Sequence, residues 1–344
     1  MTLARPTGVA PTSRLSGALL PTALQVQLSD DRRTFVNEKM LNSLDAVPAA
    51  EPGHSAEKQS PFFRLLDKAL PRLRRYLPYN RFGDRLYHRL LFLKKHHRFP
   101  GKQQLWNDVW FRVKTSNEIL DPLRVFVSDK EHVKDYVRRT VGDQHNVPTF
   151  AVLRSPAEVD ACEFPPNCCI KPTHASAQVI LRVDSAPVDR ERIKKWFAIN
   201  YYYAGREINY RTLEPKVIVE PLIFNSTNVD DFKVFCYHGV PKFVQVDFDR
   251  HTNHTRKLFD TDWNEQDFSI IYPRSTIHFP KPATLPEMLS IARRLSAPFS
   301  FIRIDLYSDE RQVLVGEITN CSANAGGFFL PRSAEARASR LMFG

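Results

Sequence analysis

Apolar residues recur at helical spacing in several segments after residue 125. One such segment carries Val133, Tyr136, Val137 and Val141. This spacing predicts a helix over residues 128–142, with Ser128 or Asp129 as its N-cap and Gly142 as its C-terminal stop. Two further helices are predicted over residues 189–203 and 285–296.

Short runs of continuous or alternating apolar residues separate these helices and predict strands. The predicted strands cover residues 146–153, 168–172, 178–183, 215–223, 231–249 as a hairpin turned at His238-Gly239, and the pair 299–307 and 311–319. Antiparallel hairpins combined with helices on one side indicate an α+β fold.

The N-terminal part of the chain has a different character. Residues 1–60 are rich in Pro, Ala, Ser and Thr without sustained periodicity, which predicts a disordered tail. Residues 61–125 are predicted to be helical. Within them, "FFRLLDKALPRLRRYL" has the pattern of an amphipathic basic helix interrupted at Pro71.

Composition places the chain among globular proteins. It has 344 residues, of which 42% are hydrophobic and 25% are charged. No apolar run reaches the length of a membrane span, and Pro21 interrupts the one N-terminal apolar stretch that could suggest a cleaved signal peptide. The five cysteines form no CxxC pair, which favours reduced thiols in a cytoplasmic protein over a structural zinc site.

The net charge of +11 is concentrated in one segment. Residues 61–104 contain twelve Lys or Arg residues and only two acidic residues, Asp67 and Asp84. Three interpretations stand side by side: a solvated helix packed on the main domain, a helix lying on an anionic membrane surface at the inner face, and a nucleic-acid-binding patch.

Candidate chemistry gathers on the last predicted strand pair. Side chains alternate along a strand, so Arg303 and Asp305 share one face, as do Glu317 and Thr319. If the register brings these faces together, the two carboxylates suit Mg²⁺ and the arginine suits a phosphate. The alternative is a salt-bridged hairpin that faces solvent.

Other candidates lie upstream. Lys130 stands at a helix start, where a cation is disfavoured unless an anion binds. Lys171 lies within an apolar strand and is followed by the small residues of "THASA". Glu220 ends a strand just before Pro221, so the chain beyond it could present backbone groups to an adenine ring; the alternative is a surface carboxylate at a strand end.

In their order and spacing, these stretches resemble the ATP-grasp superfamily, and within it the TupA-like family associated with teichuronopeptide and other bacterial surface-polymer biosynthesis. The resemblance covers roughly residues 95–330. It rests on "SDKEHVKDYVRRTVGDQHNVPTF", "CCIKPTHASA", "EINYRTLEPKVIVEPLI", "DDFKVFCYHGVPKFVQVDFDR", "PEMLSIARRLS" and "FIRIDLY…VGEIT".

The resemblance implies an ATP-grasp fold over residues 126–335, in which two α+β subdomains clamp a nucleotide. The nucleotide lid would cover about 150–225 and the metal-binding subdomain about 226–335. The resemblance also implies ATP and Mg²⁺ as cofactors.

The same resemblance implies a role for each matching residue. Lys130, Lys171, His174, Ser176, Glu220, Ile223, Asp231 and Lys233 would bind ATP; Asp305, Glu317 and Thr319 would hold the metal; Arg303 would be catalytic; and Arg250 would meet an acidic substrate. Thr319 stands where many ATP-grasp enzymes have asparagine, which puts its part in metal binding in doubt.

One departure bears on activity. The phosphate loop of the family is usually written with glycines, as in HGSG, whereas this chain has His174-Ala175-Ser176-Ala177. Glycine permits positive φ and a close backbone approach. The leading hypothesis is an ATP- and Mg²⁺-dependent ligase acting on an acidic sugar polymer or an amino acid. A catalytically weak nucleotide-binding scaffold is the first alternative, and a nucleic-acid-binding protein, which leaves the 303–319 cluster unexplained, is the second.

Overall fold

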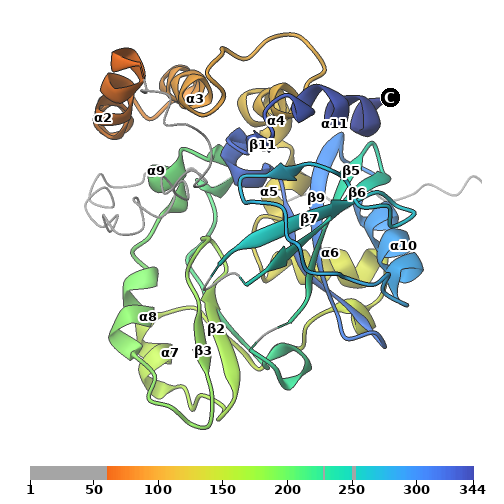
Figure 1. The fold of residues 1–344 in the computed structure, drawn as a ribbon. Coiled ribbons are helices and arrows are strands. Elements are labelled where there is room, and N and C mark those ends of the chain that lie inside the picture. Colours follow the sequence, from red (N-terminus) through yellow and green to blue (C-terminus); the bar gives the residue numbers. More distant parts are fainter. Residues whose placement is uncertain (1–59, 228, 250–252) are drawn as a thin grey trace, which may run out of the picture. The chain divides into compact units, whose positions relative to one another are not determined.

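The computed structural model describes residues 60–227, 229–249 and 253–344, and the fold over these residues is α+β (Figure 1). The predicted tail over residues 1–60, apart from Ser60, and the predicted substrate residue Arg250 lie outside the described residues.

The helices are α2 (Pro61–Tyr76), α3 (Arg81–His96), α4 (Trp106–Thr115), α5 (Pro122–Phe126), α6 (His132–Thr140), α7 (Pro156–Ala161), α8 (Arg190–Trp196), α9 (Tyr201–Gly205), α10 (Leu285–Ser296) and α11 (Ala334–Phe343), with 3₁₀ turns η2 (Asn117–Leu120), η3 (Asp143–His145), η4 (Ile208–Tyr210), η5 (Ile223–Asn225) and η6 (Ser322–Ala325). The strands are β1 (Ala151–Leu153), β2 (Cys168–Pro172), β3 (Ile180–Arg182), β4 (Val217–Glu220), β5 (Asp231–Tyr237), β6 (Val240–Phe248), β7 (Thr255–Phe259), β8 (Ser269–Ile270), β9 (Phe301–Ser308), β10 (Val313–Thr319) and β11 (Phe329–Leu330).

The larger sheet has five antiparallel strands in the order β10-β9-β5-β6-β7. Alternation along β9 sends Ile302 and Ile304 into one core, which α6 and α10 cover, and Phe301 into a second core with Trp106 and Trp110 of α4. Because both faces are covered, the polar residues of β9 and β10 must meet one another or a cavity.

The smaller sheet has four antiparallel strands in the order β1-β4-β2-β3. Ile170 and Val219 on its inner face pack with Val159 of α7 and with Ile193 and Trp196 of α8. The other face of β2 carries Lys171, so the sheet is apolar on one side and charged on the other.

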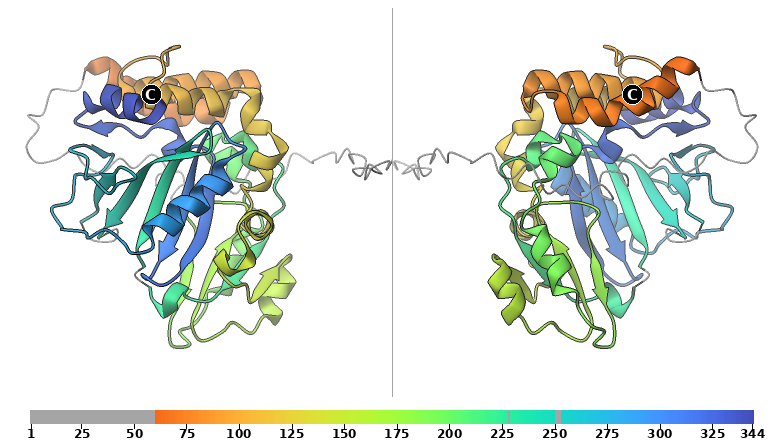
Figure 2. Two further views of the ribbon diagram at one scale, coloured as in Figure 1. Left: turned by 90° about the vertical axis from the view of Figure 1, so that its right-hand side faces the viewer. Right: turned by 90° about the vertical axis from the view of Figure 1, so that its left-hand side faces the viewer.

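The helical segment 61–104 packs on the rest of the described chain. Figure 2 shows α2 and α3 side by side, and a cluster of Leu66, Leu70, Tyr87, Leu91 and Leu93 joins them. Arg206, fully buried beyond α9, donates to the carbonyl oxygens of Leu77 (2.6 Å) and Pro78 (3.0 Å) and pairs with Asp84 (2.9 Å). Among the described residues, no helix is long and apolar enough to cross a membrane.

Two helix predictions need correction. The predicted helix 189–203 is two helices, α8 and α9, because the chain turns extended at Asn200, whose side chain accepts a hydrogen bond from the Tyr202 N–H and starts a new helix. The predicted break at Pro71 is also wrong: α2 continues through this exposed residue. The hairpin turned at His238-Gly239 is confirmed.

Candidate active site

The register between β9 and β10 brings together the polar residues that the alternation singles out. Asp305 lies opposite Glu317, and Arg303 lies opposite Thr319. A bulge between Val315 and Glu317 produces this alignment by shifting the register by one residue. Directly opposite residues of an antiparallel pair project to the same face. The sequence therefore predicts this convergence correctly.

Arg303 is the centre of this group. Its guanidinium donates to both oxygens of Asp305 at 2.6 Å and to the Thr319 hydroxyl at 3.1 Å. It also donates to the Ser322 hydroxyl at 2.9 Å, a contact from η6 that the sequence analysis missed. Burial lowers the pKa of Arg303, but Asp305 and Glu317 outweigh it and raise that pKa above its usual value, so Arg303 stays charged.

A row of alternating charges extends from this group across the sheet. Lys233 lies opposite Asp305 in the register with β9. Its ammonium pairs with Asp231 and lies 3.6 Å from Asp247. Asp247 in turn pairs with Arg256 of β7 at 2.5 Å. Sequence reasoning missed the last two residues, although their strands alternate in the same way.

Glu220 is buried between two lysines. Its carboxylate lies 2.6 Å from the Lys171 ammonium and 2.5 Å from that of Lys134 on α6, and only 3% of its side chain is exposed. The surface-carboxylate alternative for Glu220 is therefore wrong. Burial raises the pKa of Glu220, but the two lysines outweigh it and lower that pKa. Lys134 was not singled out from the sequence.

Lys130 reaches the loop that follows β2. Its backbone N–H donates to the Thr173 carbonyl (3.1 Å) and its ammonium donates to the Ala175 carbonyl (2.7 Å). The ring of His174 is held by backbone groups on both sides, because Nδ1 accepts from the Lys216 N–H and Nε2 lies 3.1 Å from the Trp196 carbonyl. Any contact between His174 and a ligand would therefore be made by the backbone of His174 and not by its ring.

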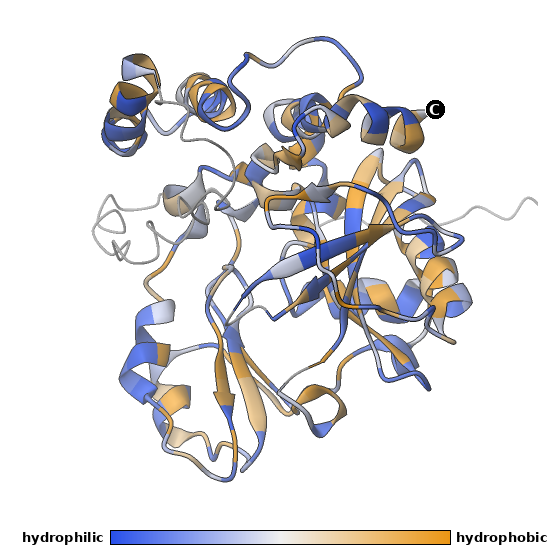
Figure 3. Cartoon of the chain, viewed as in Figure 1, coloured by the Kyte–Doolittle hydropathy of each residue, from blue (hydrophilic) through white to orange (hydrophobic). Residues whose placement is uncertain are grey.

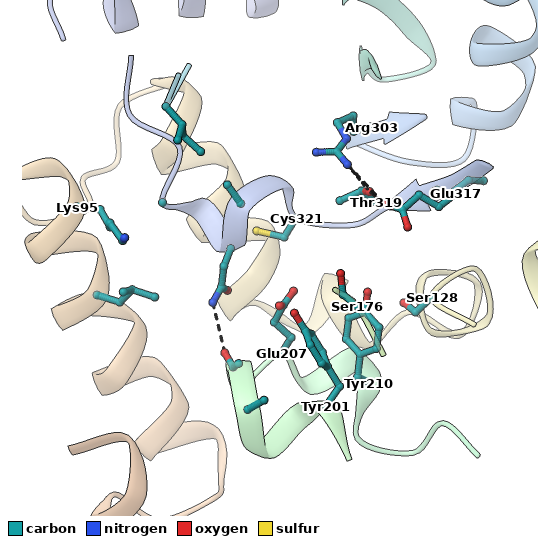
Figure 4. Close-up of a pocket in the computed structure, with 18 of the residues that line it drawn as sticks. Lys95, Ser128, Ser176, Tyr201, Glu207, Tyr210, Arg303, Glu317, Thr319 and Cys321 are labelled. Carbon is teal, nitrogen blue, oxygen red and sulfur yellow. Dashed lines mark hydrogen bonds and ion pairs between the residues drawn. The ribbon is translucent and has the colours of Figure 1, made fainter. Parts of the chain in front are cut away.

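A cavity of about 300 Å³ opens in front of the β9–β10 group (Figure 4). Of the predicted site residues, it is lined by Lys130, Ser176, Arg303, Glu317 and Thr319. The facing wall consists of Tyr201, Glu207 and Tyr210. Their roles were not predicted, because nothing in the local sequence shows that this segment faces β9 and β10.

A second cavity of about 360 Å³ lies beside the end of β4. It is lined by Pro221, Leu222 and Ile223 together with Val147 and Leu314. Asp231, Lys233, Lys171 and Glu220 line neither of these two cavities. The predicted site residues are thus distributed over two cavities and a buried ionic network.

Asp305 and Glu317 supply oxygen ligands of the kind that a hard divalent cation prefers, but the Arg303 guanidinium already holds both oxygens of Asp305, so a metal ion would have to displace that contact. Burial, together with the charge of Glu317, raises the pKa of Asp305 to about 6 against the opposing effect of Arg303. The Glu317 side chain is 43% exposed and lines the cavity. Burial raises the pKa of Glu317, but Lys130 and Arg303 outweigh it and lower that pKa. Carboxylate oxygens are the ligands that Mg²⁺ prefers.

Asp129, Glu131 and His132 form another acidic group whose ligand atoms lie close together. The ammonium of Lys216 stands among them, at 3.2 Å from Asp129 and 3.4 Å from the His132 Nε2, and also pairs with Glu131. A cation already occupies this place, so the group does not fit a metal ion.

Comparison with known proteins gives one family match. A family model described as TupA-like ATPgrasp matches residues 111–337. No curated protein matches the chain.

Solved structures similar to the chain include ligases. They include a D-alanine–D-alanine ligase from Bacillus anthracis complexed with ATP (15% identity, TM-score 0.34, covering 63% of this chain and 62% of that one). They also include an L-amino acid ligase from Bacillus licheniformis (14% identity, TM-score 0.38, covering 72% and 56%). The chain spans about three fifths of the length of these proteins, and the TM-scores are too low for the similarities to carry an argument.

Proposed function

Because the chain belongs to the TupA-like ATP-grasp family, we propose that it is an ATP- and Mg²⁺-dependent ligase. It converts a carboxylate substrate to an acyl phosphate and joins the acyl group to an amine or a hydroxyl. The observation that carries the proposal is the register that pairs Arg303 with Thr319 and Asp305 with Glu317, beside Lys130, at one cavity.

The reaction takes place in two displacements. A substrate carboxylate oxygen attacks the γ-phosphorus of ATP, the bond to the bridging oxygen breaks, and ADP leaves. The second substrate, as a neutral amine or a hydroxyl, then attacks the acyl carbon; inorganic phosphate leaves, and the proton of the nucleophile passes to solvent. Arg303, a buried cation with fixed donors, stabilises the charge on the transferred phosphate. The protein acts by positioning and electrostatics, without a nucleophilic side chain.

Asp305 and Glu317 would hold Mg²⁺, with Thr319 as a neighbouring oxygen. Bound there, the ion would neutralise phosphate oxygens and orient them. Lys130 and Lys171 bind the phosphates, and the backbone of the loop at His174 and Ser176 closes over them.

The remaining ATP residues place the nucleoside. The second cavity, with Ile223 on its wall and Glu220 at the strand end behind it, takes the adenine ring. Asp231 holds the ribose, and Lys233 approaches the nucleotide from the same strand. The lid would then cover about 150–225 and the metal-binding part about 226–335.

The biological setting in this proposal is bacterial surface polysaccharide or teichuronopeptide biosynthesis in the cytoplasm. The substrate is an acidic sugar polymer or an amino acid, and Arg250 meets its acidic group. The segment 61–104 contacts the inner face of the membrane. The exposed basic and apolar residues of α2 support this last part.

The test of the nucleotide site is calorimetry of Mg-ATP binding, with ADP release followed in the same samples. Lys171→Ala is compared with Lys134→Ala, because each removes one of the two ion pairs of Glu220. Lys171→Ala should weaken Mg-ATP binding at least tenfold more than its comparator, about 1.4 kcal/mol. Arg303→Met should retain binding and lose ADP release.

Two other outcomes would each favour a different function for this chain. Mg-ATP binding by the wild type without ADP release favours the catalytically weak scaffold, in which the alanine-bearing loop limits turnover. Absence of Mg-ATP binding contradicts the proposal, and salt-sensitive nucleic-acid binding that maps to residues 61–104 then becomes the better account.

A further inference from the structure

Two consecutive residues after α9 point in opposite directions. Arg206 takes a left-handed conformation with φ 53°, and its side chain runs into the α2–α3 pair. Glu207, the next residue, lines the cavity of about 300 Å³ instead. The many bonds of Arg206 therefore fix the place where the Glu207 carboxylate enters the cavity.

The Glu207 carboxylate has no hydrogen bond and no ion pair with any residue in the described part of the chain. Figure 4 shows its oxygens beside the hydroxyl groups of Tyr201 and Tyr210, on the wall that faces Arg303 and Thr319. Lys114, a buried amine nearby, acts on Glu207 only from beyond ion-pair distance. Burial raises the pKa of Glu207, and the charge of Lys114 opposes this effect.

The charges on the two walls suit different ligands. Lys130 and Arg303 attract phosphate and carboxylate groups, whereas a carboxylate on the facing wall repels them. A half-buried carboxylate without a protein partner is costly unless a cation pairs with it. A group in front of Glu207 must therefore be cationic and able to donate hydrogen bonds.

We propose that Glu207, flanked by Tyr201 and Tyr210, binds the ammonium group of the second substrate. This inference rests on the proposed ligase function and gives it a direction: the β9–β10 wall holds the phosphoryl and acyl groups, and the α9–η4 wall holds the amine. It also selects an amine over a hydroxyl as the second substrate. Glu207 is a binding residue in this account.

The experiment uses the full chain saturated with Mg-ADP and probes of defined chemistry. The probes are the L-amino acids, their D forms and 1,5-diaminopentane, each paired with its N-acetylated form, and binding is measured by calorimetry. At least one amine should bind the wild type, its N-acetylated form should bind at least tenfold more weakly, and Glu207→Gln should weaken amine binding at least tenfold. Mg-ATP affinity of Glu207→Gln should not fall, because the substitution removes a carboxylate that repels phosphate groups.

The melting temperature of Glu207→Gln separates binding from a structural role. Because the carboxylate has no described protein partner, its neutral isostere should melt no lower than the wild type; a lower melting temperature overturns the inference. Amine binding that is absent, or equal in Glu207→Gln, overturns it as well. Loss of Mg-ATP binding in the wild type would instead contradict the ligase function itself.

Discussion

Ala177 lies at φ 60°, in the left-handed region that glycine enters at little cost and alanine at a cost of about 1 kcal/mol. The loop after β2 thus keeps, at this position, the conformation that a glycine would favour, with an alanine in its place. Ala175, two residues earlier, is buried and does not have a positive φ. The two alanines of the loop therefore differ: Ala177 has an unfavourable backbone conformation, whereas Ala175 has a buried side chain.

Glycine substitutions should separate them. Ala177→Gly relieves the left-handed conformation and should leave the free energy of unfolding unchanged or raise it by up to about 1 kcal/mol. Ala175→Gly removes a buried methyl group and should lower it by about 1 kcal/mol. Urea unfolding measures both. Equal destabilisation by the two substitutions would show that φ at residue 177 carries no cost.

The residues that the sequence predicted share one property: each belongs to a recognisable motif or to a strand with clear alternation. Arg303 and Glu317 are of this kind. Lys134, Asp247 and Glu207 are not, because what marks them is a partner or a cavity wall far away in the sequence. Spacing along the chain contains no information about such contacts until the fold brings them together.

At the scale of elements, each predicted strand is present in the structure, but β7, β8 and β11 were not predicted. Alternation grouped Arg303 with Asp305 and Glu317 with Thr319, but the bulge between Val315 and Glu317, which alternation does not reveal, is what brings the two groups opposite each other. The segment 189–203 has apolar residues at helical spacing throughout, and only the local bond from the Asn200 side chain ends one helix and begins the next. Periodicity does not reveal such a bond.

The outer face of α2 combines two kinds of exposed residue, visible as blue and orange in Figure 3. Lys68, Arg72 and Arg75 follow one another at i, i+4 and i+7, while Leu65 (67% exposed) and Tyr76 (79% exposed) stand beside them. The inner face is already used by contacts with α3. Basic residues that border exposed apolar ones suit an anionic bilayer surface.

The double variant Leu65→Ser/Tyr76→Ser should weaken binding of the full chain to vesicles containing phosphatidylglycerol at least fivefold in co-sedimentation. Vesicles of phosphatidylcholine alone should bind neither protein. Leu341→Ser, at an exposed position of α11, should bind like the wild type and serves as the control. Equal binding of all three proteins would exclude α2 as the contact.

At the scale of the whole described chain, two buried histidines, His88 and His174, and the partly buried His96 join segments that are distant in sequence. The ring of His88 lies 2.9 Å from the Arg206 carbonyl, that of His96 lies 2.8 Å from the Ala325 carbonyl, and His174 bridges Trp196 and Lys216. Burial lowers the pKa of all three, to about 4 for His96 and His174. All three are neutral at pH 7.

Their protonation should destabilise the fold. A folded pKa of about 4 lies below the unfolded value of about 6.5, so the unfolded chain takes up the proton first. Each such histidine contributes stability that is complete above pH 6.5 and is lost as the pH falls toward 4, at most about 3 kcal/mol. Urea unfolding gives the free energy of unfolding at each pH. Between pH 6.5 and 4.5 this free energy should fall less steeply in His96→Gln, by a slope that corresponds to about one proton.

His278→Gln, at an exposed position, supplies the comparison and should keep the wild-type slope. If His96→Gln also keeps that slope, the ring of His96 is not buried neutral in the folded protein. Comparing variants in this way cancels the opposite contribution of Asp305, whose raised pKa favours the folded state as the pH falls.

Arg206 and Glu207 connect the α2–α3 pair directly to the wall of the cavity. One peptide unit connects a side chain anchored in the α2–α3 pair to a side chain on the wall of the cavity. A displacement of the helical pair would therefore be expected to carry Glu207 with it, and with Glu207 one wall of the space in front of Arg303.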